Sequence, residues 1–276
     1  MSKAVRLAHG AFGRVALLDM DESLVRHAHP HCHVLIKARG ADTRFAVHDR
    51  QARLGDDNAV LINAWEPHAY VHDQARPRTT ILALYIEPAW LSAFRPNWAA
   101  SAGPGFFTRD VGALTARLRG LADSLVGLML AEPAAGAAQQ ALLADLMVGV
   151  IERFADWRGI GADCHVDWRV RRAIATMRAD PANLPDMAAL ARASGLSRAH
   201  FFRLFSQATG LAPRMFANML RLESAMTEVM GGGRSMAEVS DELGFSAPAH
   251  FTRFFRDHAG AAPSEFRAVA RLHAAA

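Results

Sequence analysis

The final third of the chain contains an internal repeat. Gly195-Leu196-Ser197 recurs 49 residues later as Gly244-Phe245-Ser246, and after one inserted residue the match continues at an offset of 50 residues. The matched positions are His200, Phe201, Arg203, Phe205, Gly210, Pro213 and Phe216 in the first copy, and His250, Phe251, Arg253, Phe255, Gly260, Pro263 and Phe266 in the second. Since the repeat occurs twice, it indicates a duplicated unit rather than a long solenoid.

The first copy has the pattern of two short helices joined by a tight turn. Asp186 is a suitable N-cap for a helix over Met187–Ser194, and Gly195 supplies the turn that ends it. Ser197 then caps a second helix over Arg198–Ala208, whose inner face is apolar. A pair of this kind is a helix-turn-helix, and its second helix fits the major groove of DNA.

The second copy repeats the same features. Ser235 and Glu238 form a capping box at the start of its first helix, and Gly244 supplies the turn. The second helix is expected over Ala247–Ala259, with an aromatic inner face. Two such units in one region predict a DNA-binding domain more strongly than either unit does alone.

Charge agrees with this interpretation without proving it. Residues 168–276 carry 14 arginines and nine acidic residues, whereas residues 1–167 carry 17 basic and 18 acidic residues. Concentrated positive charge favours a polyphosphate partner, because neutralised phosphates release counterions. The same surplus of arginine also fits a domain that is merely kept soluble.

The first ninety residues have the pattern of an antiparallel sandwich or barrel. Short β-favouring segments alternate with turn-forming groups. The segments are Arg14–Leu18, Val34–Ala38, Arg44–Val47, Ala59–Trp65 and Thr79–Ile86.

Leucines at three- and four-residue spacing between Val111 and Trp157 then predict an antiparallel helical pair. This pair is expected either to pack on the strands or to present an apolar stripe to a second copy of the chain. The polar stretch at 158–163 is the expected domain boundary, because everything after Asp167 has a helical pattern. The sequence thus predicts an α+β protein in which an N-terminal antiparallel β-barrel with a helical hairpin precedes an all-α domain of two helix-turn-helix units.

Residues from about 170 to 270 resemble the AraC/XylS family of bacterial transcription regulators. Besides the repeat, the connecting Arg221-Leu222-Glu223-x-Ala225 matches the family's pattern. The resemblance implies a linker helix near Arg214–Met230 that sets two recognition helices into successive major grooves, about 34 Å apart. It also implies eight residues at base edges, namely Arg198, Ala199, Phe202 and Arg203 in the first unit and Pro248, Ala249, Thr252 and Arg253 in the second.

These eight positions differ in what they offer a base. Arginine forks onto guanine, which favours base contacts for Arg203 and Arg253, although arginine at such a place also holds phosphate or a neighbouring carboxylate. Alanine, proline and phenylalanine touch a thymine methyl group but do not hydrogen-bond a base edge. The resemblance therefore predicts DNA binding without predicting the operator sequence.

The N-terminal half carries a cluster of histidines. His27-Ala28-His29-Pro30-His31-Cys32-His33 is followed by Pro67-His68, and with the strand pattern these residues resemble a cupin barrel over about residues 10–90. Metal-binding cupins use a similar set, so the resemblance implies a possible site for a divalent transition metal at His27, His29, His33 and His68. His31 replaces one of them if the register shifts by two. The alternative is that these side chains only line a pocket or an exposed strand.

Together the resemblances imply a cupin-like sensing and dimerisation domain at 1–165, with a hairpin at about 108–158, and an AraC-type DNA-binding domain at 166–276. The expected partners are double-stranded promoter DNA and a small-molecule effector in the barrel, with RNA polymerase and a second copy of the chain as possible partners. A metal-dependent cupin enzyme with an accessory helical domain is the rival hypothesis. The sequence contains no phosphate loop, nucleophile elbow or catalytic triad that would support such an enzyme. A third hypothesis is a DNA-binding protein whose barrel is purely structural.

The cysteine content and the apolar segments indicate the cellular compartment. With only two cysteines, Cys32 and Cys164, no disulfide framework is expected, and no secretory signal is evident at the start. No stretch approaches the roughly 18 unbroken apolar residues of a membrane span. A cytoplasmic protein with no membrane partner is therefore expected.

Overall fold

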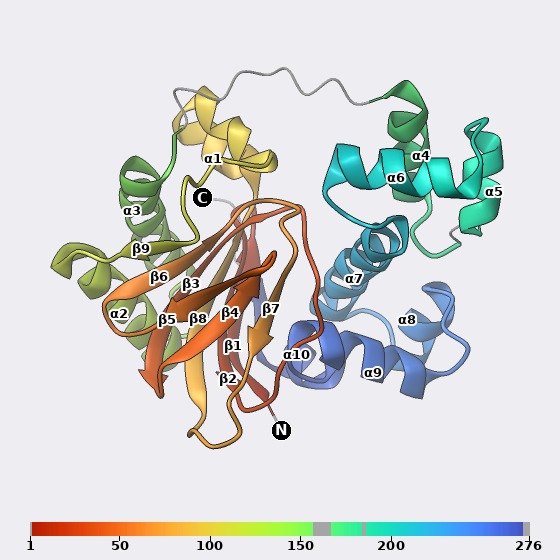
Figure 1. The fold of residues 1–276 in the computed structure, drawn as a ribbon. Coiled ribbons are helices and arrows are strands. Elements are labelled where there is room, and N and C mark those ends of the chain that lie inside the picture. The colour runs from red at the N-terminus through yellow and green to blue at the C-terminus, as the bar shows by residue number, and fades with distance from the viewer. Residues whose placement is uncertain (1, 157–166, 184–185, 273–276) are drawn as a thin grey trace.

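The computed structural model describes residues 2–156, 167–183 and 186–272, and it divides into a β-rich N-terminal part and a helical C-terminal part (Figure 1). The predicted α+β class is confirmed. The expected boundary at 158–163 and Cys164 lie outside the described residues, so the domain limits stay a prediction.

The N-terminal part is built from two sheets. The larger has the strand order β10-β1-β2-β8-β3-β6-β9 and the smaller has the order β5-β4-β7. Neighbouring strands are antiparallel, except that β10 runs parallel to β1. The strands are β1 (Lys3–Gly10), β2 (Gly13–Met20), β3 (Cys32–Gly40), β4 (Thr43–Val47), β5 (Arg50–Leu54), β6 (Asn58–Ile62), β7 (His68–Val71), β8 (Thr79–Ile86), β9 (Val111–Ala113) and β10 (Ala270–Leu272).

The alternation of side chains along β3 shows how the layers are arranged. Leu35 packs with Phe45 and Tyr70 of the smaller sheet, so the two sheets enclose a common core in place of a single continuous barrel ladder. Val34 and Ile36 point to the other side and pack against the helical hairpin. Successive residues of a strand face opposite sides, which is why the larger sheet is apolar on both faces.

The helical pair covers the outer face of the larger sheet, which decides between the two arrangements that the sequence left open. Helices α2 (Ala116–Ala131) and α3 (Gly136–Phe154) pack on each other and share one buried cluster with β3, β6 and β8 (Figure 1). They follow helix α1 (Pro88–Phe94) and a 3₁₀ helix at Pro96–Ala102. None of the helices in the described part of the chain has the length and apolar character needed to cross a bilayer.

Two predicted segments need correction. Val111–Ala113 is a strand, not the start of the helical pair, because it pairs with β6 at the sheet edge. The strand predicted to reach Trp65 ends at Ile62. Beyond it the chain leaves the ladder, since the Asn63 side chain accepts a hydrogen bond from the backbone N–H of Phe107 at 2.7 Å and Trp65 has a φ of +64°.

The C-terminal part contains the two predicted helix-turn-helix units, joined by one long helix. Their helices are α4 (Trp168–Ala179), α5 (Met187–Ala193), α6 (Arg198–Thr209), α7 (Pro213–Gly231), α8 (Met236–Glu242), α9 (Pro248–Ala259) and α10 (Pro263–Val269). Ser197 caps α6, and the capping box of Ser235 and Glu238 starts α8. Gly195 and Gly244 adopt φ values of +67° and +71° in the two turns, as the repeat predicts.

The two parts of the chain touch along α7, at the C-terminal end of α9, where the backbone N–H of Val25 donates to the Asp257 carbonyl oxygen, and at the C-terminal strand. The C-terminal domain, predicted to be all-α, ends in strand β10, because Ala270–Leu272 pairs with β1 and extends the larger sheet. Helix α10 also packs on β1. In Figure 1, α7 lies between the two helix-turn-helix units, with α5 and α6 at one end and α8 and α9 at the other. The linker helix that the sequence predicted is thus present.

Candidate nucleic-acid interface and histidine cluster

Helices α6 and α9 each have an aromatic inner face. Phe201 and Phe205 in α6 and the matching Phe251 and Phe255 in α9 are fully buried. The inner face anchors each helix in its own unit, because burying a phenylalanine contributes about 1.5–3 kcal/mol. The opposite face of each helix is therefore left toward solvent.

The eight predicted base-edge residues lie on that outer face. Arg198, Ala199 and Arg203 of α6 are exposed and so are Pro248, Ala249 and Arg253 of α9, while Phe202 and Thr252 are partly buried. Neither Arg203 nor Arg253 has a hydrogen bond or ion pair with any residue that the structure describes. A carboxylate partner for these two guanidinium groups, one alternative left by the sequence, is not present in the described ranges.

The predicted histidine set is brought together in part. One ring nitrogen of each of His29, His33 and His68 lies within 4.8 Å of the others, and all three side chains are buried. The ring of His27 lies 4.4 Å from that of His68, centre to centre, but His27 is not part of the mutual cluster. His31 does not replace any of them, because its Nε2 atom donates to Glu87 at 2.8 Å.

The four histidines His27, His29, His33 and His68 are held in one tautomer. Each donates from Nδ1 to a backbone carbonyl oxygen, at distances of 2.8, 3.1, 2.9 and 2.8 Å respectively. Burial lowers the pKa of each, and neighbouring histidines lower it further, to about 3 for His33 and His68. These rings are therefore neutral at pH 7.

The contact between α7 and the N-terminal part contains a buried ion pair that the sequence analysis did not find. The guanidinium of Arg14 in β2 donates to both carboxylate oxygens of Glu223 in α7, at 2.9 and 3.1 Å. Burial alone would raise the pKa of the Glu223 carboxyl group, but Arg14 and His31 hold it below its ordinary value. In the sequence Glu223 belongs to the connecting pattern Arg221-Leu222-Glu223-x-Ala225, and nothing local predicts its partner 209 residues away.

Apolar contacts surround the same junction. The rings of Trp65 and Phe216 stack with centres 4.7 Å apart, and the Arg178 guanidinium lies 5.7 Å from the Trp65 ring centre. These three side chains line a cavity of about 350 Å³ between the two parts, together with Asn63, Ile174 and Gln207. The cavity inside the β-rich part, by contrast, measures about 20 Å³.

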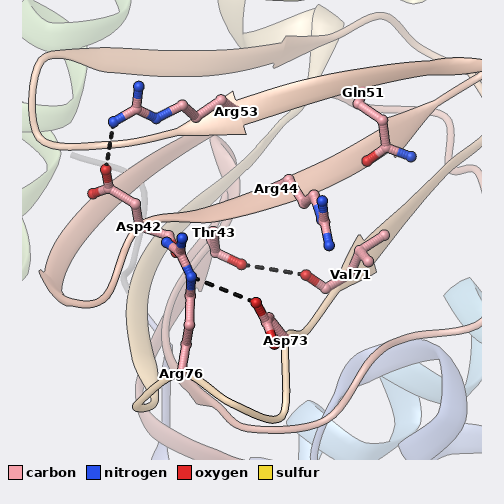
Figure 2. A pocket seen from close by; sticks show the side chains of 8 residues that line it. All are labelled: Asp42, Thr43, Arg44, Gln51, Arg53, Val71, Asp73 and Arg76. Carbon is pink, nitrogen blue, oxygen red and sulfur yellow. Dashed lines mark hydrogen bonds and ion pairs between the residues drawn. The ribbon is translucent and has the colours of Figure 1, made fainter.

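A third cavity, of about 260 Å³, lies on the smaller sheet. Figure 2 shows its lining, in which Arg53 pairs with Asp42 and Arg76 pairs with Asp73. Its charged groups are largely exposed, and four of the five form pairs of opposite charge. Such an exposed and mostly paired lining does not favour an organic effector.

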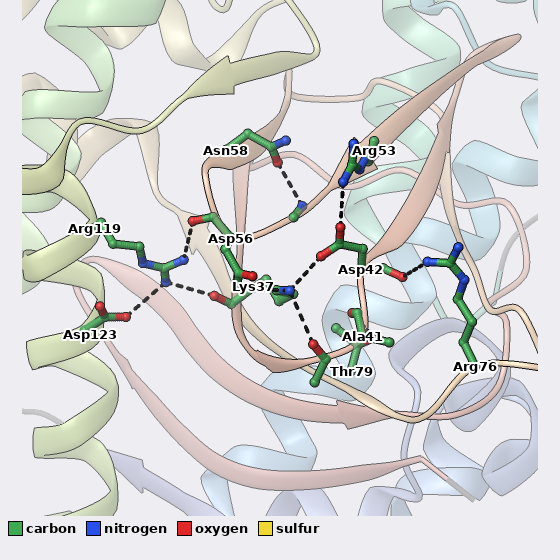
Figure 3. A network of polar contacts seen from close by, with 12 residues as sticks. Lys37, Ala41, Asp42, Arg53, Asp56, Asn58, Arg76, Thr79, Arg119 and Asp123 are labelled. Atoms are coloured by element: carbon green, nitrogen blue, oxygen red, sulfur yellow. Dashed lines mark hydrogen bonds and ion pairs between the residues drawn. The ribbon is translucent and has the colours of Figure 1, made fainter.

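A neighbouring polar network holds the sheet to the hairpin. The buried Lys37 ammonium contacts Asp42 at 2.6 Å and Asp56 at 3.0 Å, and Arg119 of α2 donates to the Lys37 carbonyl oxygen (Figure 3). The hydrogen bonds to Arg53 and Lys37 lower the pKa of Asp42 to about 2. This network fixes α2 on the sheet and contains no group left free for a reaction.

Family models match two stretches of the chain. A model described as an AraC-like ligand binding domain matches residues 14–147, and one described as a helix-turn-helix domain matches residues 190–268. These stretches correspond to the β-rich part with its hairpin and to the repeat with its connecting helix. A comparison with curated proteins finds no match.

Solved structures similar to the whole chain include ToxT from Vibrio cholerae. An apo lysine-to-alanine variant of strain SCE256 is 11% identical, with a TM-score of 0.58, over 92% of this chain and 96% of that one. The wild-type protein of the same strain bound to an unsaturated fatty acid is 12% identical, with a TM-score of 0.57, over 92% and 94%. At such identities the likeness shows a shared fold, which here spans both parts and their connection.

Proposed function

The chain is an AraC-family transcriptional regulator, in which a ligand-binding domain precedes a helix-turn-helix DNA-binding domain, and on that basis we propose how it reads DNA and where its effector binds. Helices α6 and α9 enter successive major grooves of one promoter. The observation that carries this proposal is that Arg203 and Arg253, at matched positions of the repeat, are both exposed and have no partner among the described residues.

The composition of the outer faces sets the kind of readout. Arg203 and Arg253 provide bidentate contacts to guanine, and the Thr252 hydroxyl adds a weaker polar contact. Ala199, Pro248, Ala249 and Phe202 offer only apolar contacts, which suit thymine methyl groups. We therefore propose an operator with one conserved guanine in each half-site and half-sites one helical turn apart.

Selection of binding sequences by the full-length protein tests this proposal. Two motifs whose centres lie about 10–10.5 base pairs apart are expected. Each arginine-to-alanine change should remove the preference for guanine at one position and weaken binding by about 1–3 kcal/mol. Arg117→Ala is the matched control, because Arg117 is an exposed arginine in α2, on the N-terminal part. Retention of both guanine preferences in the Arg203→Ala and Arg253→Ala variants would contradict the assigned readers.

We further propose that an organic effector binds in the cavity at the domain junction. Its volume of about 350 Å³ lies in the range of ligand pockets, whereas about 20 Å³ inside the sheets holds roughly one water. Trp65 on the N-terminal side and Phe216 and Ile174 on the C-terminal side provide apolar walls, and Arg178 provides a positive charge. The Glu66 carboxylate also lines the cavity, but it already accepts hydrogen bonds from Asn63. An apolar acid suits this lining, and a ToxT structure contains an unsaturated fatty acid.

An effector that bridges the two parts would change how α7 is held and thus how α6 and α9 are presented. Thermal shift with a series of fatty acids checks the site, with Arg178→Leu expected to weaken binding of acids more than of the matching alcohols. Equal binding of acids and alcohols by the unaltered protein would contradict the role given to Arg178.

The remaining partners follow from the family. A homodimer and a contact with RNA polymerase stay predictions, and sedimentation of the full chain with and without operator DNA tests the first. We propose a regulator without catalytic activity that acts in the cytoplasm, where the promoter of a bacterial gene lies.

A further inference from the structure

The histidine cluster has the geometry of a metal site. The ring centres of His29, His33 and His68 are separated by 4.8, 4.9 and 5.5 Å. Imidazole nitrogens bind zinc at about 2.0–2.1 Å, so three rings on one tetrahedral ion have centres about 5 Å apart and ligating nitrogens about 3.3 Å apart. The rings are thus near their liganded spacing, and the nitrogens, now within 4.8 Å, need to approach each other further.

The hydrogen bonds of these rings leave one nitrogen of each available. A carbonyl oxygen only accepts, so the three Nδ1 atoms carry hydrogen and the three Nε2 atoms carry lone pairs. The Nε2 atoms of His29 and His68 are buried without any hydrogen-bond partner. Buried polar atoms normally have partners, and a histidine that binds a metal normally donates its other ring hydrogen to a carbonyl or carboxylate.

The surroundings also fit an ion with an open coordination position. His33 and His68 border the cavity of about 20 Å³ inside the sheets, which accommodates about one water as a fourth ligand. Imidazole ligands suit zinc, nickel, copper or cobalt better than magnesium or calcium, which prefer oxygen.

We propose that His29, His33 and His68 bind a divalent first-row transition-metal ion through their Nε2 atoms, and that α7 senses its presence. The predicted four-histidine set is thereby reduced to three. The sensing part of this inference depends on the proposed DNA-binding function, whereas the binding part does not.

Contacts of the segment around His29 provide the connection to α7. The backbone N–H of Ala28 donates to Met219 Sδ at 3.2 Å, and His31 Nδ1 lies 3.9 Å from the Glu223 carboxylate. The His29 carbonyl oxygen accepts a hydrogen bond from the backbone N–H of Trp65 at 2.7 Å, and Trp65 stacks on Phe216. When an ion draws His29 inward, these contacts with Met219, Glu223 and Phe216 of α7 must adjust.

Titration of the metal-free full-length protein with Co²⁺ tests the binding part. One equivalent is expected to give the visible ligand-field bands of a four- or five-coordinate nitrogen site, and Zn²⁺ should displace it. His29→Gln and His68→Gln keep polar side chains in the cluster and should weaken binding more than about 100-fold, given that loss of an outer partner alone costs 10–100-fold. His72→Gln, outside the cluster, is the matched control and should bind like the unaltered protein.

Circular dichroism of the metal-free variants checks that they fold. A third variant, His33→Asn, removes the remaining ligand independently. Absence of stoichiometric binding in the unaltered protein would overturn the proposal. Equal loss in the His72→Gln control would do the same, because binding would then lie outside the cluster.

Gel retardation with selected DNA tests the sensing part. Zn²⁺ is expected to change the affinity of the unaltered protein about 5-fold or more and to leave that of His29→Gln unchanged. Metal binding with no change in DNA affinity would overturn the sensing role. If neither the unaltered protein nor His29→Gln retards DNA at low salt without metal, the proposed DNA-binding function is contradicted. The result of the metal titration is not affected by that outcome.

Discussion

Replacing Glu223 with alanine removes the carboxylate that faces Arg14 across the domain junction. The Arg14 side chain is 6% exposed and that of Glu223 is 21% exposed, so water cannot fully replace the lost partner. Removing one member of a buried pair costs about 3–5 kcal/mol. Glu87 still attracts Arg14, and the guanidinium lies 4.1 Å from the Tyr85 ring centre, so we expect the lower end, about 3 kcal/mol.

Urea unfolding followed by tryptophan fluorescence measures this loss. The matched control is Glu152→Ala, since Glu152 lies on a helix and pairs with Arg95 at 3.0 Å, but those side chains are 48% and 46% exposed. An exposed pair contributes about 0–1 kcal/mol, so the control should lose little. The double variant Arg14→Met/Glu223→Leu should recover about 2 kcal/mol relative to Glu223→Ala, because no unpaired charge remains buried.

Equal losses for Glu223→Ala and Glu152→Ala would refute this reasoning. So would a double variant that is no more stable than Glu223→Ala, because the unpaired charge would then not be the source of the cost.

Three further results are expected. The stability difference between the unaltered protein and Glu223→Ala should persist above about pH 4.3 and disappear as the pH falls through the lowered pKa of Glu223. A carboxyl group whose folded-state pKa is lowered stabilises the fold only while it is ionised, and unfolding measured over a series of acid pH values tests this. Gly244→Ala should destabilise more than Gly195→Ala in thermal unfolding: both positions have positive φ, which costs about 1–2 kcal/mol, but a Cβ atom at Gly244 would lie 2.9 Å from the Ala182 carbonyl oxygen, whereas Gly195 has open space. Asp42→Asn should cost about 1–3 kcal/mol in urea unfolding, because the buried Lys37 then keeps only the exposed Asp56 as an anionic partner, beside the Gly40 carbonyl oxygen. A smaller loss than for Asp56→Asn would contradict the burial argument.

The sequence by itself determined the helix-turn-helix units almost to the residue. The helix predicted over Arg198–Ala208 spans Arg198–Thr209, and the one predicted over Ala247–Ala259 spans Pro248–Ala259. The Ser197 cap of α6 and the turn glycines and aromatic faces of both units all act within a dozen residues, whereas no side chain that the structure describes caps α9. Their duplication supplied the signal that single motifs lack.

The sequence predicted the central, apolar strand of the larger sheet more accurately than the strands with more exposed residues. The limits of Thr79–Ile86 were predicted without error, because this strand lies between β2 and β3 and is apolar on both faces. Strands β1, β5, β7, β9 and β10 were not predicted. In β5 only Ala52 and Leu54 are buried, and this strand lies at the edge of the smaller sheet, where β4 is its partner in the ladder, so its mostly polar sequence carries little strand signal.

The tertiary structure alone decided what the two parts do to each other. No residue near Arg14 predicts its ion pair with Glu223, and no residue near Ala270 predicts its pairing with β1. The five histidines in the sequence do not predict which three rings form the cluster. These contacts join residues far apart in the chain, and their energy depends on burial and orientation that exist only after both parts have folded. Local patterns therefore predicted the DNA-reading units, and packing between distant segments created the junction that would control them.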